Sequence, residues 1–412
     1  PVYIAAKAGQ VAAIDILVKH GADVDMCNCD GASPVFVSAV KGRTAAIDTL
    51  VKHGANIRQP DNYGRAPIYA AAHEGHTGAI DTLVKHGADV NQASNDGATA
   101  VWAAAFHGQV GAIATLAAHG ANVKQATYKG AAPMYVAAQE GHAGAIAILA
   151  EHGADVNQAR NDGAAPLVAA AGKGRVVAIT TLVNLGAIVN QATKHGRTPL
   201  FSAADNGQVD AIDALVKHGA DIDHVDIKGA TPLFSAALRG VAESIAVLAN
   251  HGADVNHVAN DGATPVYVAA RQRHMKALDV LVQHGANVNR ATNRGRTPCY
   301  VATMFNHVSA IDALVKHGAN VNTSNNNRRT PVYVAAQNGC VDAINALIKH
   351  GADVDEAAAD GTSPLKIAAR VGSVRTIDAL IKHGADVNQA SKNGATPVFT
   401  AARHGQVAAI DT

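Results

Sequence analysis

The chain has 412 residues, of which 48% are hydrophobic and 16% are charged; 34 basic and 33 acidic side chains give a formal net charge of +1. This balance provides no electrostatic attraction for nucleic acid or for an anionic membrane surface, so neither is expected as a direct partner. No apolar run is long enough to cross a bilayer. The four cysteines lack the spacing of a zinc site and favour a reducing, cytoplasmic location.

One pattern returns every 33 residues along the whole sequence, without an insertion or a deletion. A Gly-Ala pair marks each repeat, and a Pro stands in the same register of every repeat except one, which has Ala100. A fixed period of this size predicts a stacked array in which each repeat buries its apolar face against its neighbours. We therefore expect a single solenoid over residues 1–412, with about twelve full repeats and a partial one, truncated within a repeat at both ends.

Every repeat predicts the same elements in the same order, and residues 198–230 illustrate them. The pair Thr198-Pro199 is typical of a helix start, so we expect a first helix that ends at Gly207. A second helix is expected over about 209–218, where apolar residues recur on one helical face. Residues 220–229 have no helical period and predict an extended, hairpin-like loop, which we call the finger.

These landmarks resemble the ankyrin repeat, and the resemblance covers all 412 residues. It is carried by Thr198-Pro199-Leu200, by the pair Ala203-Ala204, and by Leu215 followed by Gly219-Ala220. The resemblance implies an all-α repeat solenoid of helix-turn-helix pairs with short β-hairpin fingers, curved into a superhelical array. It also implies that the first helices and the fingers form a concave groove that binds other proteins.

The chain departs from the family three residues after the helix-starting Thr. The family usually carries His there, whereas this chain carries an aromatic residue in most repeats, with Val168 and Lys366 as exceptions. Two interpretations remain open. The aromatic side chains form either an inter-repeat ladder that supports stacking or a strip that contacts a partner segment.

Histidine is abundant, with 21 copies, and many stand just before the Gly that closes the second helix, as His53 and His86 do. A donor at this position stabilises free carbonyls and the helix dipole. Copies one repeat apart lie about 10 Å from each other, which is too far to share a metal ion, so no metal site is expected.

Asp and Lys four residues apart, such as Asp48/Lys52, are expected to pair on a solvated face of the second helix.

The repeats differ most from one another over residues 271–329. Arg273 and Asn306 replace the Gly that ends the first helix, and Arg328 replaces the turn Gly before Thr-Pro. Because arginine adopts the left-handed region less readily than glycine, we expect either a local rearrangement or a use for the charge. Neutral variation at exposed turns remains the alternative. The basic segment predicts a site for an acidic segment of a protein partner, with Arg271, Arg273, His274, Arg294, Arg296, Arg328 and Arg329 as its residues.

Two further places differ from the common pattern. Over residues 100–151, alanines replace charges on the second helices, and the only tryptophan, Trp102, stands in the same stretch. A less polar face could pack against another chain, so Trp102 is a further candidate partner-binding residue. The finger at residues 26–30 contains Cys27 and Cys29, for which a thiol-based role is the less favoured interpretation.

Motifs of catalysis are not found. The sequence lacks a Gly-rich phosphate loop, G-x-S-x-G and H-E-x-x-H, and its carboxylates recur once per repeat rather than converging, so neither a catalytic site nor a cofactor is expected. We expect a non-enzymatic scaffold or adaptor that binds protein partners along the groove. The alternative is a structural spacer or filament component, built from a longer array that associates with copies of itself. An enzyme or channel whose other domains lie outside this chain is a third interpretation.

Overall fold

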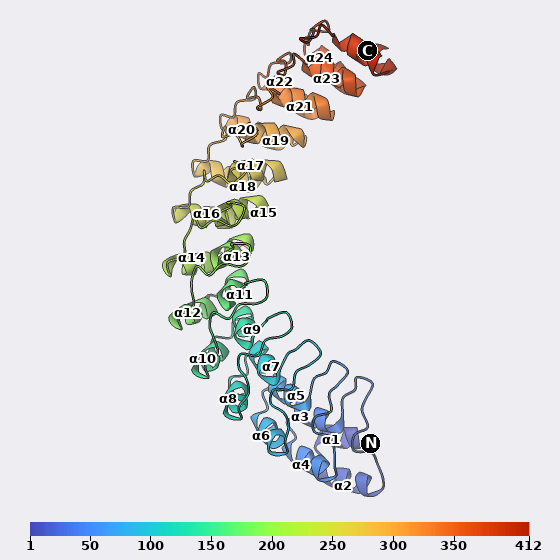
Figure 1. The fold of residues 1–412 in the computed structure, drawn as a ribbon, viewed down its shortest axis with the longest axis vertical. Helices are drawn as coiled ribbons and strands as arrows, with labels where there is room; N and C mark the ends of the chain where they lie inside the picture. Colours follow the sequence, from blue (N-terminus) through green and yellow to red (C-terminus); the bar gives the residue numbers. More distant parts are fainter. Residues whose placement is uncertain (412) are drawn as a thin grey trace. The chain divides into compact units, whose positions relative to one another are not determined.

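The computed structural model describes residues 1–411, and this range contains 26 helices and no β-strand (Figure 1). The helices come in pairs, in which an odd-numbered first helix is followed by an even-numbered second helix. The predicted all-helical solenoid of helix-turn-helix pairs is thereby confirmed. The first helices are α1 Val2–Ala8, α3 Pro34–Val40, α5 Pro67–Glu74, α7 Ala100–Phe106, α9 Pro133–Glu140, α11 Pro166–Gly172, α13 Pro199–Asp205, α15 Pro232–Arg239, α17 Pro265–Gln272, α19 Pro298–Met304, α21 Pro331–Asn338, α23 Pro364–Val371 and α25 Pro397–Arg403. The second helices are α2 Val11–Lys19, α4 Thr44–Lys52, α6 Thr77–Lys85, α8 Val110–Ala118, α10 Ala143–Glu151, α12 Val176–Asn184, α14 Val209–Lys217, α16 Ala242–Asn250, α18 Met275–Gln283, α20 Val308–Lys316, α22 Val341–Lys349, α24 Val374–Lys382 and α26 Val407–Asp411.

A serine or threonine side chain caps the start of most first helices, as the sequence predicts. The Thr264 hydroxyl accepts a hydrogen bond from the Tyr267 N–H at 3.3 Å. This bond satisfies one of the free N–H groups of the first turn and stabilises the helix start by about 1 kcal/mol. The proline that follows has no N–H to satisfy and already has a helical φ. The same cap forms at Ser33, Thr99, Thr231, Thr297, Thr330, Ser363 and Thr396.

Branched apolar side chains of the second helices and alanines of the first helices form the core. Ile47 and Leu50 on α4 are fully buried, as are Ala71 and Ala72 on α5. Small alanine side chains let α5 pack closely between α3 and α7. Burying a leucine or isoleucine side chain stabilises the fold by about 1.5–3 kcal/mol. Because much of that burial comes from neighbouring repeats, a repeat is stable only within the array.

Left-handed residues end the first helices. Gly75 follows α5 with φ of 80°, and the capping N–H groups bind the carbonyls of the last helical turn. Arg273 follows α17 with φ of 60° and the same capping bonds, and Asn306 has φ of 54°. Arginine therefore adopts the conformation of the glycine it replaces, and the local rearrangement that we considered for this position does not occur.

The fingers are turns held together by side chains. The carboxylate of Asp61 accepts hydrogen bonds from the N–H groups of Tyr63 and Arg65 at 3.0 and 2.9 Å. The backbone of one finger is tied to the preceding finger, because the Asn62 N–H donates to the Asp30 carbonyl at 3.0 Å. The expected hairpins are thus present as linked turns rather than as paired strands.

Asparagine side chains join the chain segments that follow neighbouring second helices. The Asn157 amide oxygen accepts from the Ile188 N–H at 2.9 Å, while its amide nitrogen donates to the Gly186 carbonyl at 3.2 Å. Asn256, Asn289 and Asn322 make the same two bonds to the repeat that follows each of them. One side chain therefore satisfies two backbone groups of the next repeat.

Histidine and aspartate join neighbouring second helices, which the sequence analysis did not foresee. His53 Nε2 lies 2.7 Å from Asp15 Oδ1, and His86 Nε2 lies 2.6 Å from Asp48 Oδ1. These aspartates contact the histidine of the next repeat at ion-pair distance, while the charge of Lys52, four residues after Asp48, also acts on that carboxylate. The His86 hydrogen bond holds the pKa of Asp48 below its usual range. His119 with Asp81 and His350 with Asp312 repeat this arrangement.

The chain divides into two compact units. The N-terminal unit comprises Pro1–Ala203 and Asp210–Asp221, and the C-terminal unit comprises Ala204–Val209 and the described part of Ile222–Thr412. Within each unit, first helices pack on first helices of adjacent repeats and on the second helix of their own repeat, as α17 does with α15, α19 and α18. A single solenoid over the whole chain stays a prediction.

Candidate partner-binding surface

The candidate residues of the basic segment all lie in the C-terminal unit. Arg271 is in the last turn of α17, and Arg273 and His274 form the turn before α18. Arg294 and Arg296 belong to the finger before α19, and Arg328 and Arg329 to the finger before α21. The candidate residues therefore extend over two consecutive repeats, residues 264–296 and 297–329, at the end of a first helix, in the turn after it and on fingers.

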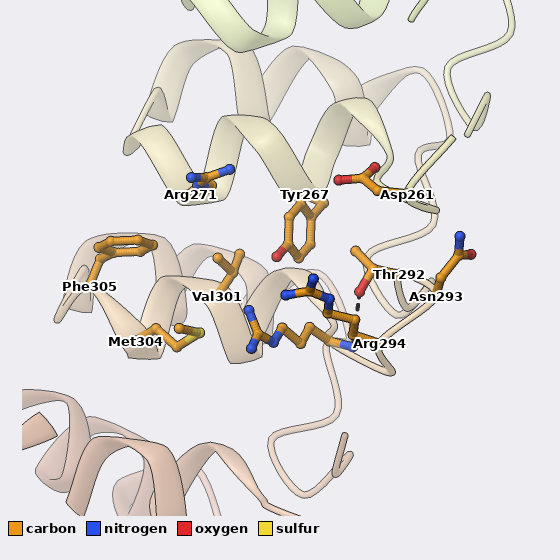
Figure 2. A pocket seen from close by; sticks show the side chains of 10 residues that line it. Asp261, Tyr267, Arg271, Thr292, Asn293, Arg294, Val301, Met304 and Phe305 are labelled. Atoms are coloured by element: carbon orange, nitrogen blue, oxygen red, sulfur yellow. Dashed lines mark hydrogen bonds between the residues drawn. The ribbon is translucent and has the colours of Figure 1, made fainter. Parts of the chain in front are cut away.

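A pocket of about 530 Å³ brings three of these arginines together. Arg271 reaches it from α17, while Arg294 and Arg296 reach it from the finger that precedes α19. Figure 2 shows Arg271, Met304 and Phe305 on one side of Tyr267, and Asp261 and Asn293 on the other. The space lies at the junction of two repeats. Its remaining lining residues are Thr292 and Val301.

The arginines of this pocket have no acidic partner in the described part of the chain. Within residues 1–411, no carboxylate lies within ion-pair distance of Arg271, Arg294 or Arg296, whereas Arg239 in the same unit binds Asp205 at 3.2 Å. The one acid that lines the pocket, Asp261, uses Oδ1 to accept from the Ala263 N–H at 3.0 Å. The guanidinium N–H groups of Arg271 and Arg294 are therefore free to donate to an incoming anion, while Arg296 also interacts with the Tyr267 hydroxyl.

Burial and the two aromatic residues next to it hold Arg296 in place. Its guanidinium carbon lies 6.0 Å from the ring centroid of Tyr300, and its Nε is buried without a hydrogen-bond partner. Burial raises the pKa of the Tyr267 hydroxyl, while the nearby guanidinium groups of Arg296 and Arg271 act to lower it. The charge of Arg296 is thus positioned by the ring face of Tyr300, which attracts a cation, rather than by a carboxylate.

A family model described as "Ankyrin repeats (3 copies)" matches residues 2–94, 91–160, 156–226, 219–292, 287–358 and 353–412. The chain belongs to the ankyrin-repeat family. Ankyrin repeats are generally protein–protein interaction modules and are generally non-catalytic. Among solved structures, the human ASB11 ankyrin repeat domain is similar: the identity is 29%, the match covers 50% of this chain and 92% of that chain, and the TM-score is 0.45. No similarity to a curated protein was found.

The aromatic side chains of these ankyrin repeats make contacts beyond the two interpretations considered from the sequence. The rings at this position are mostly buried, as Tyr300 and Tyr333 are at 2% exposure. They do not form ring-to-ring pairs with one another in residues 1–411; instead Arg329 lies over the Tyr333 ring at 5.3 Å, and Asn325 donates to the Tyr300 hydroxyl at 3.0 Å. The sequence signal was the recurring Arg-Thr-Pro-x-Tyr, which places Arg and Tyr four residues apart.

Four of the basic candidate residues do not line the pocket: Arg273, His274, Arg328 and Arg329. Arg273 and Arg328 are exposed, and both have a left-handed backbone. The His274 ring lies 3.2 Å from the Leu238 carbonyl of the preceding ankyrin repeat, so its Nε2 is engaged in joining repeats. In contrast, Tyr267, Met304 and Phe305 line the pocket although sequence analysis did not select them as site residues.

Trp102 lies on α7 in the N-terminal unit, and therefore not on the alanine-rich second helices α8 and α10. Its ring stacks on Phe106, with 5.4 Å between centroids and an interplanar angle of 12°. The indole Nε1 is buried and has no hydrogen-bond partner within the described residues. Nearby, the rings of His73 and His107 lie 3.8 Å apart. A partner-binding role of Trp102 stays a prediction.

Neither a membrane-spanning helix nor a metal site is found in residues 1–411. No helix there is long and apolar enough to cross a membrane. No group of three or more His, Cys, Asp or Glu side chains is arranged to hold a metal ion in the same range. The four cysteines are free thiols, and burial raises the pKa of Cys299 to about 12.

Proposed function

We propose that this ankyrin-repeat protein is a non-enzymatic scaffold or adaptor whose C-terminal unit docks an acidic segment of a partner protein. The docking surface is formed by the ends of α17 and α19 and by the fingers that precede α19 and α21. The observation that carries this proposal is the group of arginines at one pocket without an acidic partner. The cytoplasmic location expected from the sequence stays a prediction.

The physical reason is charge complementarity at an otherwise balanced molecule. The chain has almost equal numbers of basic and acidic residues, so a surface with several unpaired arginines is a local departure from the average. Complementary charge accelerates encounter and selects the partner, and bidentate Arg–carboxylate bonds then orient it. A segment rich in Glu or Asp meets both requirements.

The proposal is tested by titrating the full chain with fluorescent peptides, one rich in glutamate and one rich in lysine, at low and high salt. The glutamate peptide is expected to bind, with an affinity that falls as salt rises. Arg273→Ala combined with Arg328→Ala should weaken binding several-fold, because both side chains are exposed cations of the basic segment.

Lys276→Ala is the matched control, because Lys276 is an exposed cation on the second helix α18, away from the fingers. It should leave the affinity almost unchanged. Equal binding of the two peptides, or an unchanged affinity in the double arginine variant at controlled salt, contradicts the proposed docking surface.

A structural spacer or filament component is the second candidate function. It is favoured by the hydrogen bonds that recur at successive repeat junctions, such as those of Asn256, Asn289 and Asn322, because identical junctions suit an array of any length. Light scattering over a concentration series tests it. Growth of the apparent mass with concentration supports self-association, and a constant monomer mass argues against it.

A further inference from the structure

We propose that the pocket between α17 and α19 is a two-part site, which binds an acidic side chain of the partner segment next to an apolar one. The carboxylate accepts hydrogen bonds from the arginines that line the pocket, and the apolar side chain packs on Met304 and Phe305. This inference rests on the proposed function and specifies the chemistry of its ligand.

The polar half of the site consists of Arg271 and Arg294, supported by Arg296. The first two are exposed and have no hydrogen-bond acceptor for their guanidinium groups among the described residues, so the N–H groups of both are available to a ligand. Arg296 is half-buried and stacked on Tyr300, which fixes one positive charge at the pocket. A guanidinium group that is already held in position loses less conformational entropy when it binds a carboxylate.

The apolar half of the site lies at the C-terminal end of α19. Phe305 is 48% exposed although its ring is large and apolar, and Met304 beside it is half-buried. Phe305 is held in place by its stacking on His307, with 5.8 Å between the ring centroids. An exposed ring next to a flexible methionine side chain offers an adaptable apolar contact.

Asp261 sets the orientation of the ligand. In Figure 2 it lies on the far side of Tyr267 from Arg271, Met304 and Phe305. Its negative charge repels a carboxylate, so the acidic side chain is expected on the Arg271 side of the pocket, close to the apolar half. The acidic and the apolar residue of the ligand should therefore be near neighbours in its sequence.

The N-terminal unit contains a pocket in the same register of the repeat, six repeats earlier, but with a negative charge at a position where the C-terminal pocket has a positive one. It is lined by Tyr63, Arg65, Tyr69, Ser94, Asn95 and Asp96, so that Asp96 stands where the C-terminal pocket has Arg294. The two pockets recur because the repeats have the same backbone structure at this position. The exchange of an arginine for an aspartate explains why an acidic ligand selects the C-terminal copy.

The test uses the full chain and four labelled peptides that differ at two neighbouring positions: Glu with Leu, Glu with Gly, Gln with Leu, and phosphoserine with Leu. Fluorescence anisotropy gives each dissociation constant. The Glu–Leu peptide should bind most tightly, and replacing Glu by Gln should weaken binding roughly tenfold, the order expected for hydrogen bonds to a charged group.

Three variants separate the two halves of the site. Arg294→Ala should weaken binding of the Glu–Leu peptide roughly tenfold and leave the Gln–Leu peptide unchanged. Phe305→Ala should remove the preference for Leu over Gly while keeping the preference for Glu. The control Arg290→Ala removes the same charge from an exposed residue outside the pocket and should weaken binding less than about twofold.

The outcomes distinguish this inference from the proposed function. If Arg294→Ala and Arg290→Ala weaken binding equally, attraction is spread over the surface, and the two-part site is wrong while acidic docking stands. If neither Glu peptide binds, both proposals fail. Tighter binding of the phosphoserine peptide than of the Glu–Leu peptide would reassign the site to phosphate, and retention of the Leu preference in Phe305→Ala would remove its apolar half.

Discussion

Arg273 and Arg328 hold φ values of 60° and 54°, at positions where most other repeats of the chain have glycine. For a residue with a Cβ atom this conformation costs about 1–2 kcal/mol. The capping N–H groups after α17 nevertheless bind Ala269 and Ala270 in the usual way, so the surrounding hydrogen bonds impose the conformation. The sequence identified these residues as unusual. Whether the backbone rearranges or keeps the left-handed conformation with an arginine side chain depends on the neighbouring contacts, which the sequence does not show.

Replacing Arg273 by glycine should therefore stabilise the protein. We expect Arg273→Gly to raise the free energy of unfolding by about 1 kcal/mol, because the strain of the left-handed backbone is relieved. Urea denaturation monitored by circular dichroism measures the change. As a control, Arg271→Gly changes a residue with helical backbone and should lower stability by up to about 1 kcal/mol. A loss of stability in Arg273→Gly would contradict this interpretation of the positive φ.

At the scale of helices, adjacent second helices are joined by the pairing of an aspartate with a histidine 38 residues later in the chain. The sequence showed both residue types, but it suggested pairs within one helix, because spacing along a helix is visible in a sequence and contact between helices is not. The hydrogen bond from His86 lowers the pKa of Asp48. A carboxyl whose pKa is lower in the folded state contributes stability at pH values above the unfolded pKa and loses it as pH falls through the folded one.

Asp48→Asn tests this contribution. It should lower the free energy of unfolding at pH 7 by no more than about 1 kcal/mol, because the carboxylate is partly exposed and solvent screens the pair. The difference from the unchanged protein should shrink below about pH 3.9, the usual pKa of a free aspartate, where the carboxyl becomes protonated in both states. Asp279→Asn is the matched control, because Asp279 occupies the same register on α18 without a histidine bond in the described residues. An equal effect of the two substitutions would rule out the His86 pair as the cause.

The helices themselves were predictable because their signals are local. Thr-Pro starts, apolar faces and closing glycines all lie within a few residues of the boundaries they define, and α13 and α14 appear within about a residue or two of the expected positions. The pocket was only half predictable. Arg271, Arg294 and Arg296 stood out as departures from the repeat, whereas Met304 and Phe305 gain their role from the packing of two repeats, which no single repeat reveals.

At the scale of the whole molecule, stability depends on neighbours on both sides of each repeat. Helices in the middle of either unit bury several side chains, but α2 buries only Ile14 and α26 buries none. Phe399 is 56% exposed, while Tyr300 at the equivalent position of an internal repeat is 2% exposed. Loss of burial lowers the local free energy of opening.

We therefore expect this chain to open from its ends. Hydrogen exchange followed by mass spectrometry should show the weakest protection in α1, α2, α25 and α26, and stronger protection in internal helices such as α5 and α19. The apolar contacts that internal helices gain from two neighbours are the physical reason. Uniform protection from end to end would contradict this picture.

The asparagine bridges have a consequence for how such a chain changes length. Asn256 binds backbone groups of the repeat that follows, and Asn289 and Asn322 do the same one and two repeats later. Duplication or loss of a block of 33 residues recreates every bridge at the new junction, whereas an insertion of a single residue shifts a donor away from its acceptor. Addition or removal of whole blocks therefore keeps these bridges where a small insertion does not, in agreement with the uninterrupted period of the sequence.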